Sequence, residues 1–299
     1  STPMETYGAI AHYETAPDRY SVWSNFQGPF ILQPLMARAL RILGNQLRLI
    51  SAPYSGGSFG IKQGLYPYLV LLAAASRLLG CPLKWTEDRL EHLSGSSSAS
   101  DRADAIEAAF DDEGQLIGLR YDNCVNVGAY VRAPEPASVY RMHAASNGCY
   151  KVRDIGVWNR LVTTNKTPIG LNRGYGGPQF YFGLERAMDT AARRMEIDPA
   201  ELRRRNFISG DTFPYEAPAG AIYDSGDYAK GLDLLLEIAG YEDLKICRDQ
   251  ARASGRAFGI GFGAGVEPSG SNMAYVTLAQ TPEERAKAGG RSGGTAVAN

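Results

Sequence analysis

The spacing of apolar residues divides the chain into segments of two periods. Alternation of apolar and polar positions, rich in β-branched and aromatic residues, is typical of strands, whereas spacing at i, i+3 and i+4 is typical of helices. The first pattern predicts strands at 19–27, 47–51, 81–88, 155–165, 257–267 and 272–280. The second predicts helices at 30–43, 63–79, 178–195, 199–207, 228–239 and 243–254.

Turn and cap residues support several of these segments. The residues 105–131 form two alternating runs around the turn "DDEG", which predicts a β-hairpin. Pro178 suits the first turn of a helix, and Asp198 suits the N-cap of the next one. The helix that follows carries "RRR" at 203–205, for which we expect a solvated face.

The order of the predicted elements indicates the fold class. Strand 47–51, a glycine-rich loop, helix 63–79 and strand 81–88 form a βαβ arrangement. Together with the hairpin this predicts an α+β fold of mixed sheets with packed helices. We expect residues 1–280 to form one folded region, with room for two sub-domains, and 281–299 to be a glycine-rich linker or a truncated boundary.

Composition excludes several functions. The formal net charge is −1 and no basic stripe is present, so a nucleic-acid partner is not expected. The four cysteines, at 81, 124, 149 and 247, show no CxxC spacing, so neither zinc nor an iron–sulfur cluster is predicted in this chain. This cysteine usage and the absence of a signal-peptide pattern favour a cytoplasmic protein. The apolar stretch 64–76 is too short to span a membrane and predicts a buried helix.

Two glycine-rich loops carry the candidate chemistry, "SGGSFGIKQ" (55–63) and "NRGYGGPQ" (172–179). Glycines before a helix can cradle an anion or simply make a tight turn, and the first loop alone leaves both open. In the second loop Arg173 could hold a ligand or form a surface ion pair, and Tyr175 could stack on a ligand or belong to the core. Neither loop has the spacing of a dinucleotide fingerprint or a P-loop.

Longer blocks of sequence carry a family resemblance. They are "PMET", "GGSFGIK", "EDRLEHLSGSSSASDR", "NVGAYV", "NRGYGGPQFYFGLERAMDTAARRMEIDPAELRRRNFI" and "EPSGSNMAYVTLAQ". In this order they resemble the molybdenum-cofactor subunit of the xanthine dehydrogenase family of molybdenum hydroxylases. That family includes aldehyde oxidoreductases, carbon monoxide dehydrogenases and N-heterocycle hydroxylases.

The resemblance implies roles for particular residues. The cofactor-binding positions that match are Gly56, Gly57, Ser58, Phe59, Gly60 and Arg173. The substrate-binding positions that match are Gln63, Arg141 and Tyr175. No protein side chain is expected to bind the metal, because in the family the pterin dithiolene holds it.

Three positions depart from the family pattern. Ser58 replaces the third glycine of the first loop. Gln63 stands where purine-oxidising members have a glutamate, so a purine substrate is not favoured. Gly174 stands where carbon monoxide dehydrogenases have a cysteine, which argues against that activity.

The catalytic base of the family, a glutamate near the C-terminus of the large subunit, has no match here. Glu5, Glu87 and Glu267 do not fit its motif, so no catalytic residue is assigned. We therefore expect a fragment or one part of a split subunit.

The resemblance implies a component of a molybdenum hydroxylase that oxidises an aldehyde or an aromatic N-heterocycle with oxygen from water. It implies molybdopterin, in the cytosine dinucleotide form. It also implies partner subunits that carry a 2Fe-2S cluster and FAD, and a further chain with the second half of the cofactor site. The alternative is a non-catalytic structural or interaction subunit that keeps the fold without cofactor.

Overall fold

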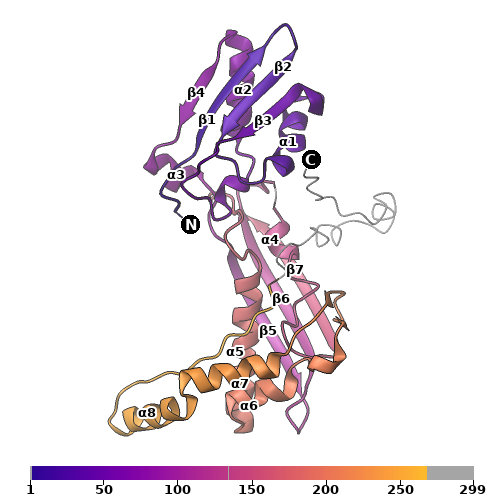
Figure 1. Cartoon of the computed structure of the whole chain (residues 1–299), viewed down its shortest axis with the longest axis vertical. Coiled ribbons are helices and arrows are strands. Elements are labelled where there is room, and N and C mark those ends of the chain that lie inside the picture. Colours follow the sequence, from indigo (N-terminus) through magenta and orange to yellow (C-terminus); the bar gives the residue numbers. More distant parts are fainter. Residues whose placement is uncertain (1, 134, 268–299) are drawn as a thin grey trace. The chain divides into compact units, whose positions relative to one another are not determined.

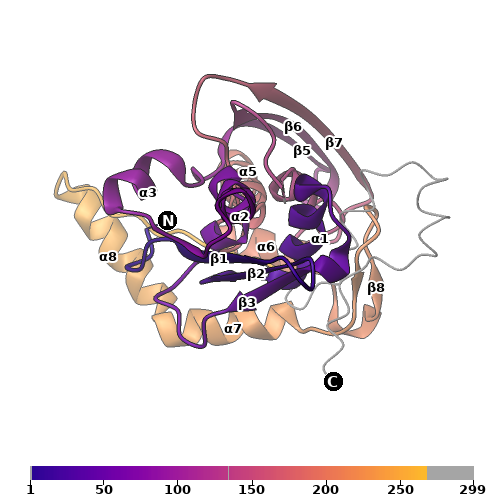
Figure 2. The same cartoon turned by 90° about the horizontal axis from the view of Figure 1, so that it is seen from above.

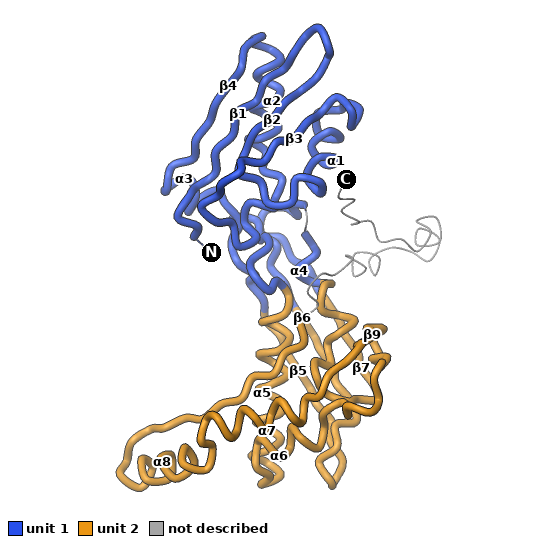
Figure 3. Tube along the Cα trace, viewed as in Figure 1, with its two compact units in different colours: residues 1–102, 124–139, 160–175 blue, residues 103–123, 140–159, 176–299 orange. Residues whose placement is uncertain are grey.

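The computed structural model describes residues 2–133 and 135–267, and these form two compact units. In Figure 3, unit 1 comprises residues 1–102, 124–139 and 160–175, and unit 2 comprises residues 103–123, 140–159 and 176–299. The chain is an α+β protein with mixed sheets, as the sequence predicts (Figure 1).

A four-stranded mixed sheet forms the centre of unit 1. Its order is β3-β2-β1-β4. The strands are β1 (Gly8–Glu14), β2 (Arg19–Ser24), β3 (Leu47–Ser51) and β4 (Leu83–Thr86). The central strand β1 is antiparallel to both β2 and β4, whereas β2 and β3 are parallel. It follows that β3 and β4 run in the same direction at opposite edges of the sheet.

Two helices cover one face of this sheet. They are α1 (Pro29–Leu40) and α2 (Pro67–Leu79), and Figure 2 shows both on the same side of β1, β2 and β3. Leu32 and Met36 of α1 and Leu69 and Ala73 of α2 pack into one buried apolar cluster with β1 and β2. The predicted βαβ arrangement from β3 through α2 to β4 is confirmed, and β1 and β2 lie between its strands.

Two details of the second helix differ from prediction. The helix starts at Pro67 rather than at 63, because Pro67 takes the first helical turn and Ile61–Gln63 forms a separate 3-10 turn, η2. It is not buried all round, since Leu71 is 65% exposed and Leu78 is 86% exposed. The remaining short helices of this half of the chain are η1 (Gly44–Gln46), α3 (Arg89–Gly95) and α4 (Ala137–Tyr140).

A second sheet has the order β5-β6-β7. Its strands are β5 (Asp101–Phe110), β6 (Leu116–Gly128) and β7 (Asp154–Thr163), and the unit boundaries fall within them. The predicted hairpin at "DDEG" is confirmed: the Asp111 amide donates to the Gln115 carbonyl over 3.0 Å.

The other elements of unit 2 are helical apart from one small ribbon. They are α5 (Gly177–Met195), α6 (Pro199–Asn206), η3 (Gly210–Thr212), β8 (Tyr215–Glu216), β9 (Ile222–Tyr223), α7 (Tyr228–Ala239) and α8 (Tyr241–Ala253). The predicted apolar face of α5 is buried through Phe180, Leu184 and Met188, which pack with Leu119 and Tyr121 of β6.

The start of α6 follows prediction, and its arginine run does not. The Asp198 carboxylate accepts from the Ala200 amide at 2.8 Å, as an N-cap should. The solvated face expected for residues 203–205 is wrong at Arg203, whose side chain is 1% exposed. Arg203 lies 2.8 Å from Glu185 and 2.9 Å from Asp189, and these two carboxylates compensate its buried charge.

The predicted strand at 257–267 is also wrong, because these residues are extended without pairing to any described strand. The predicted strand 272–280 and the tail 281–299 lie outside the described residues.

Candidate functional site

The first glycine-rich loop connects β3 to η2 through unusual backbone angles. Gly57 has φ 100°, Phe59 has φ 58° and Gly60 has φ 106°. A side chain at residue 60 would place its Cβ 2.7 Å from the carbonyl oxygen of Leu171. Glycine is therefore required at this position by both the angle and the close approach. Phe59 holds a left-handed conformation without being glycine, at a cost of roughly 1–2 kcal/mol.

Three consecutive amides of this loop face no protein acceptor. Among the described residues, the N–H groups of Gly57, Ser58 and Phe59 make no hydrogen bond. The amides on either side are engaged: Gly56 donates to the Glu5 carboxylate and Gly60 to the Gln27 side chain, each over 2.9 Å. Successive free N–H groups in a loop with left-handed residues form a concave donor site for an anionic or oxygen ligand.

Arg173 of the second loop is joined to the first loop. Its backbone N–H donates to the Phe59 carbonyl over 2.8 Å, and its guanidinium carbon lies 4.8 Å from the centre of the Phe59 ring. Thr2, Asn172, Phe59 and Arg173 line an open pocket of about 410 Å³. Arg173 forms no ion pair within the described part of the chain. Its cationic group stays available at the edge of this pocket.

A buried salt bridge anchors the first glycine-rich loop. The sequence analysis did not predict it. Lys62 Nζ lies 2.8 Å from Glu5 Oε2, and the Lys62 side chain is completely buried. Burial pushes the pKa of the Glu5 carboxyl up, but hydrogen bonds led by the one from Lys62 lower it from 4.5 to about 2. Both residues lie in the blocks that resemble the family, "PMET" and "GGSFGIK", yet only the fold shows that they pair.

Ser58 does not obstruct the loop. Its hydroxyl accepts from the amide of Lys62, a residue of η2, over 2.9 Å. The serine that replaces the family glycine therefore has a local structural use, and its backbone N–H remains among the free donors.

The predicted substrate residues are distributed over both units. Gln63 is half-buried in unit 1 and accepts a hydrogen bond from the Gln27 side chain over 3.5 Å. Tyr175, also half-buried in unit 1, stands between two glycines with left-handed φ. Arg141 belongs to unit 2, where it is buried and forms an ion pair with Glu267. The structure thus brings the glycine loop, Gln63 and Arg173 together within unit 1.

Glu5, Glu87 and Glu267 all have structural partners. Glu87 is buried, accepts from the Tyr7 amide over 2.9 Å and lies 2.7 Å from the His92 ring. No group of three or more His, Cys, Asp or Glu side chains in the described residues is arranged to hold a metal ion.

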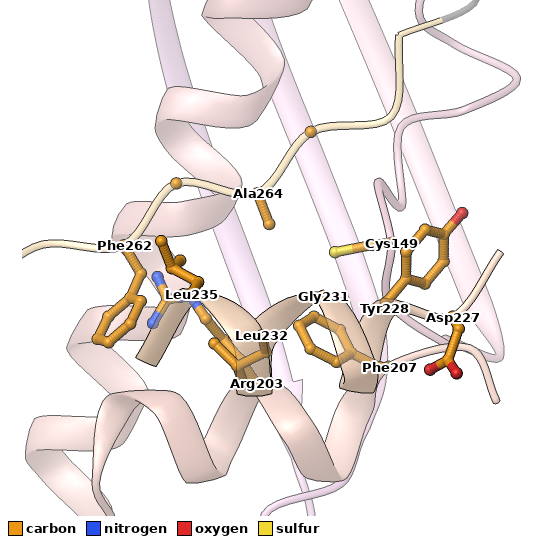
Figure 4. Close-up of a pocket in the computed structure, with 12 residues that line it drawn as sticks. Cys149, Arg203, Phe207, Asp227, Tyr228, Gly231, Leu232, Leu235, Phe262 and Ala264 are labelled. Atoms are coloured by element: carbon orange, nitrogen blue, oxygen red, sulfur yellow. The ribbon is translucent and has the colours of Figure 1, made fainter. Parts of the chain in front are cut away.

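Unit 2 contains a separate pocket of about 250 Å³, drawn in Figure 4. Its walls come from α7 and from residues 262–265, with apolar side chains such as Leu232 and Phe262. The polar groups at its edge are not suited to chemistry: Arg203 is paired with two carboxylates, and burial raises the pKa of the Cys149 thiol to about 12. The pocket of unit 1 is therefore the better candidate site.

Comparison with known proteins shows the family of this chain. Residues 1–207 match the family model for a molybdopterin cofactor-binding domain. The chain belongs to this family, the molybdopterin cofactor-binding domain of molybdenum hydroxylase large subunits. No helix in the described residues is long and apolar enough to cross a membrane.

Over the residues that align, the curated relatives are about one-third identical to this chain. The nicotine 6-hydroxylase large subunit of Paenarthrobacter nicotinovorans is 34% identical over 92% of this chain and 34% of its own length. In the same organism, subunit gamma of the 6-hydroxypseudooxynicotine dehydrogenase complex is 30% identical over 99% of this chain and 38% of its own length. The carbon monoxide dehydrogenase large chain of Afipia carboxidovorans is 32% identical over 86% of this chain and 32% of its own length.

A solved structure leads to the same conclusion. Quinoline 2-oxidoreductase from Pseudomonas putida 86 superposes with a TM-score of 0.77 at 32% identity, over 85% of this chain and 32% of that chain. The chain spans about a third of the length of the relatives it matches.

Proposed function

We propose that this chain forms part of the molybdenum site of a hydroxylase that oxidises an aldehyde or an aromatic N-heterocycle, with water as the oxygen source. The observation that carries the proposal is the row of unpaired amides at Gly57, Ser58 and Phe59, beside the cationic side chain of Arg173. The cofactor would be molybdopterin, in its cytosine dinucleotide form.

The residues present fit such a cofactor. Free N–H donors suit the oxygen-rich surroundings of a molybdenum centre, and glycine at residue 60 lets the loop approach Leu171 closely. When bound, the cofactor supplies the two-electron oxidation of the substrate. The amides of the loop would bind and orient it, Arg173 would offer positive charge beside it, and Gln63 and Tyr175 of unit 1 would contact the substrate.

The proposal includes partners, since relatives carry names of large subunits and of a complex subunit. Electrons would leave to an iron–sulfur subunit and then to an FAD subunit, in a cytoplasmic complex. A further segment or chain would supply the second half of the cofactor site and the catalytic base. The alternative, a structural subunit without cofactor, is weakened, because the Ser58 side chain binds the Lys62 amide and leaves the loop amides free.

Metal analysis of the complex purified from its host through a tag on this chain tests the proposal. We expect close to one molybdenum atom per complex, together with iron and flavin. Gly60→Ala should lower the molybdenum content severalfold, because its Cβ would meet the Leu171 carbonyl oxygen at 2.7 Å.

Gly80→Ala is the matched control for that variant. Residue 80 also has a left-handed φ, of 64°, but a Cβ there meets no atom within 4 Å. Both variants carry the cost of a left-handed residue, about 1–2 kcal/mol. Only Gly60→Ala adds the clash with Leu171, and only this variant should lose metal. A fully assembled wild-type complex without molybdenum would contradict the proposal.

A further inference from the structure

The extended segment 257–267 of unit 2 has one packed face and one open face. Four of its side chains pack against the buried apolar clusters of this unit, and the residues between them are exposed: Ile260, Phe262, Ala264 and Val266. The centre of the Phe262 ring lies 5.3 Å from that of the Tyr241 ring and 5.2 Å from the guanidinium carbon of Arg203. The segment is therefore held on unit 2 with the two-residue alternation of a β-strand.

Every residue on the open face from 259 to 265 is a glycine. At Gly259, Gly261 and Gly263 a Cβ would meet no atom within 4 Å, and none of the three has a left-handed φ. Neither packing nor backbone angle within the described residues therefore requires glycine at these positions. Glycine weakens a strand, and where it occurs in one it often marks the close approach of another backbone. The alternating glycines thus indicate a neighbour that lies directly against this face.

The backbone of the segment is an unprotected strand edge. Among the described residues none of its N–H groups donates a hydrogen bond, and of its carbonyls only that of Val266 accepts one, from the Tyr181 hydroxyl. Natural edge strands avoid unwanted pairing by means of charged residues, prolines or bulges. From Ala257 to Val266 the segment has neither a charged residue nor a proline. Such an edge is suited to accept a further strand.

The pocket in Figure 4 lies along the same segment. Residues 262–265 form one wall, and Gly231, Leu232 and Leu235 of α7 form the other. A Cβ at Gly231 would meet no atom within 4 Å, and Leu235 is 51% exposed. The pocket of about 250 Å³ therefore has room for an apolar side chain that comes from outside unit 2.

We propose that residues 257–266 are the docking strand for the part of the large subunit that this chain does not span. That part adds a β-strand to the open edge, lies against the glycine face and places an apolar side chain in the pocket beside α7. Such a neighbour is implied by length, because the chain spans about a third of its relatives. The surface is uncharged, as is typical of permanent interfaces rather than transient ones.

This inference rests on the proposed function, in which a further segment or chain completes the cofactor site. It adds the place and the manner of docking.

Hydrogen exchange at single-residue resolution, in the complex purified through a tag on this chain, tests the pairing. An added strand protects the amides that point toward it, which are every second amide of the segment. We expect alternate amides between 258 and 266 to exchange at least tenfold more slowly in the complex than in this chain alone. Fast exchange of all of them in the complex would overturn the proposal. Protection already present in the chain alone would also overturn it, because the partner would then be the chain itself or a second copy.

A double variant tests the glycine face. Gly261→Val together with Gly263→Val should leave the Tm of this chain unchanged or higher, because both positions have room and valine favours an extended backbone. In the complex the same variant should lose the protection of the alternate amides. Gly95→Val is the control, since a Cβ at this residue of unit 1 also meets no atom within 4 Å, and it should change neither result. Protection that persists in the double variant would contradict a neighbour against this face.

Photo-cross-linking identifies the neighbour. Ala257→p-benzoylphenylalanine should give a cross-link to the remaining part of the large subunit, and a cross-link to an iron–sulfur subunit, an FAD subunit or a second copy would overturn the proposal. The molybdenum content separates this inference from the proposed function. A complex that holds molybdenum and lacks the alternating protection refutes the docking strand alone. A complex without molybdenum refutes the proposed function, and the exchange pattern still decides the docking.

Discussion

The salt bridge beneath the glycine loop gives a stability effect that depends on pH. Lys62 is completely buried and its ammonium lies 2.8 Å from Glu5, whose side chain is 42% exposed. We predict that Glu5→Gln destabilises the protein, because it leaves a buried cation with a neutral partner. Removing one partner of a fully buried pair costs about 3–5 kcal/mol, and this pair is only half shielded from water.

The pKa of Glu5 gives a second value for the stability that Glu5→Gln should lose. It falls from 4.5 to about 2, and about 2.5 pH units at ~1.4 kcal/mol each amount to about 3.4 kcal/mol. Solvent screening of the exposed part of the carboxylate reduces this, so we expect about 1–2 kcal/mol at neutral pH. That corresponds to a decrease in Tm of about 2–6 °C.

The pH dependence follows from the direction of the pKa change. A carboxyl whose folded pKa is depressed stabilises the protein above its unfolded pKa, and the contribution is lost as the pH falls through the folded pKa. The difference between wild type and Glu5→Gln should be full above about pH 5.5 and less than half of that at about pH 3.

Thermal unfolding monitored by circular dichroism between neutral and acidic pH measures this difference. Glu14→Gln is the control in the same unit, because its partner Arg19, 3.2 Å away, is 43% exposed and can be solvated when the carboxylate is lost. This variant should cost below about 0.5 kcal/mol. The reasoning is refuted if the two variants behave alike, or if the effect of Glu5→Gln is undiminished in acid.

Three further outcomes are expected from the same structure. Arg203→Met should lower the free energy of unfolding by about 3–5 kcal/mol, because it leaves two carboxylates without their cation, as denaturant titration would show. Ser58→Ala should cost about 0.5–1.5 kcal/mol in the same assay, since the Lys62 amide loses the hydroxyl that accepts its hydrogen bond. Iodoacetamide at neutral pH should alkylate the exposed Cys81 and leave Cys149 unmodified, as mass spectrometry would show. The reason is that Cys149 is buried and burial raises its pKa to about 12. Equal labelling of the two cysteines would contradict that placement.

Local pattern predicts most of the helices and strands. The helix 228–239 was predicted with the bounds that α7 has, and the strand 47–51 with those of β3. In both cases the signals lie within the segment: Gly240 in a left-handed conformation ends the helix, and a short apolar run forms the strand. The error at 257–267 has the opposite cause. Alternation describes a segment able to form a strand, but a strand also needs a partner, and the sequence pattern contains no information about the partner.

In the candidate site, too, features within one loop could be predicted from sequence, whereas contacts between distant residues could not. The glycines and Arg173 could be predicted because the resemblance is local to two loops. Glu5 and Lys62 are 57 positions apart, and their pairing depends on how β1 and the loop come together in the fold. Arg203 was misjudged for the same reason, since the carboxylates that compensate it come from another helix.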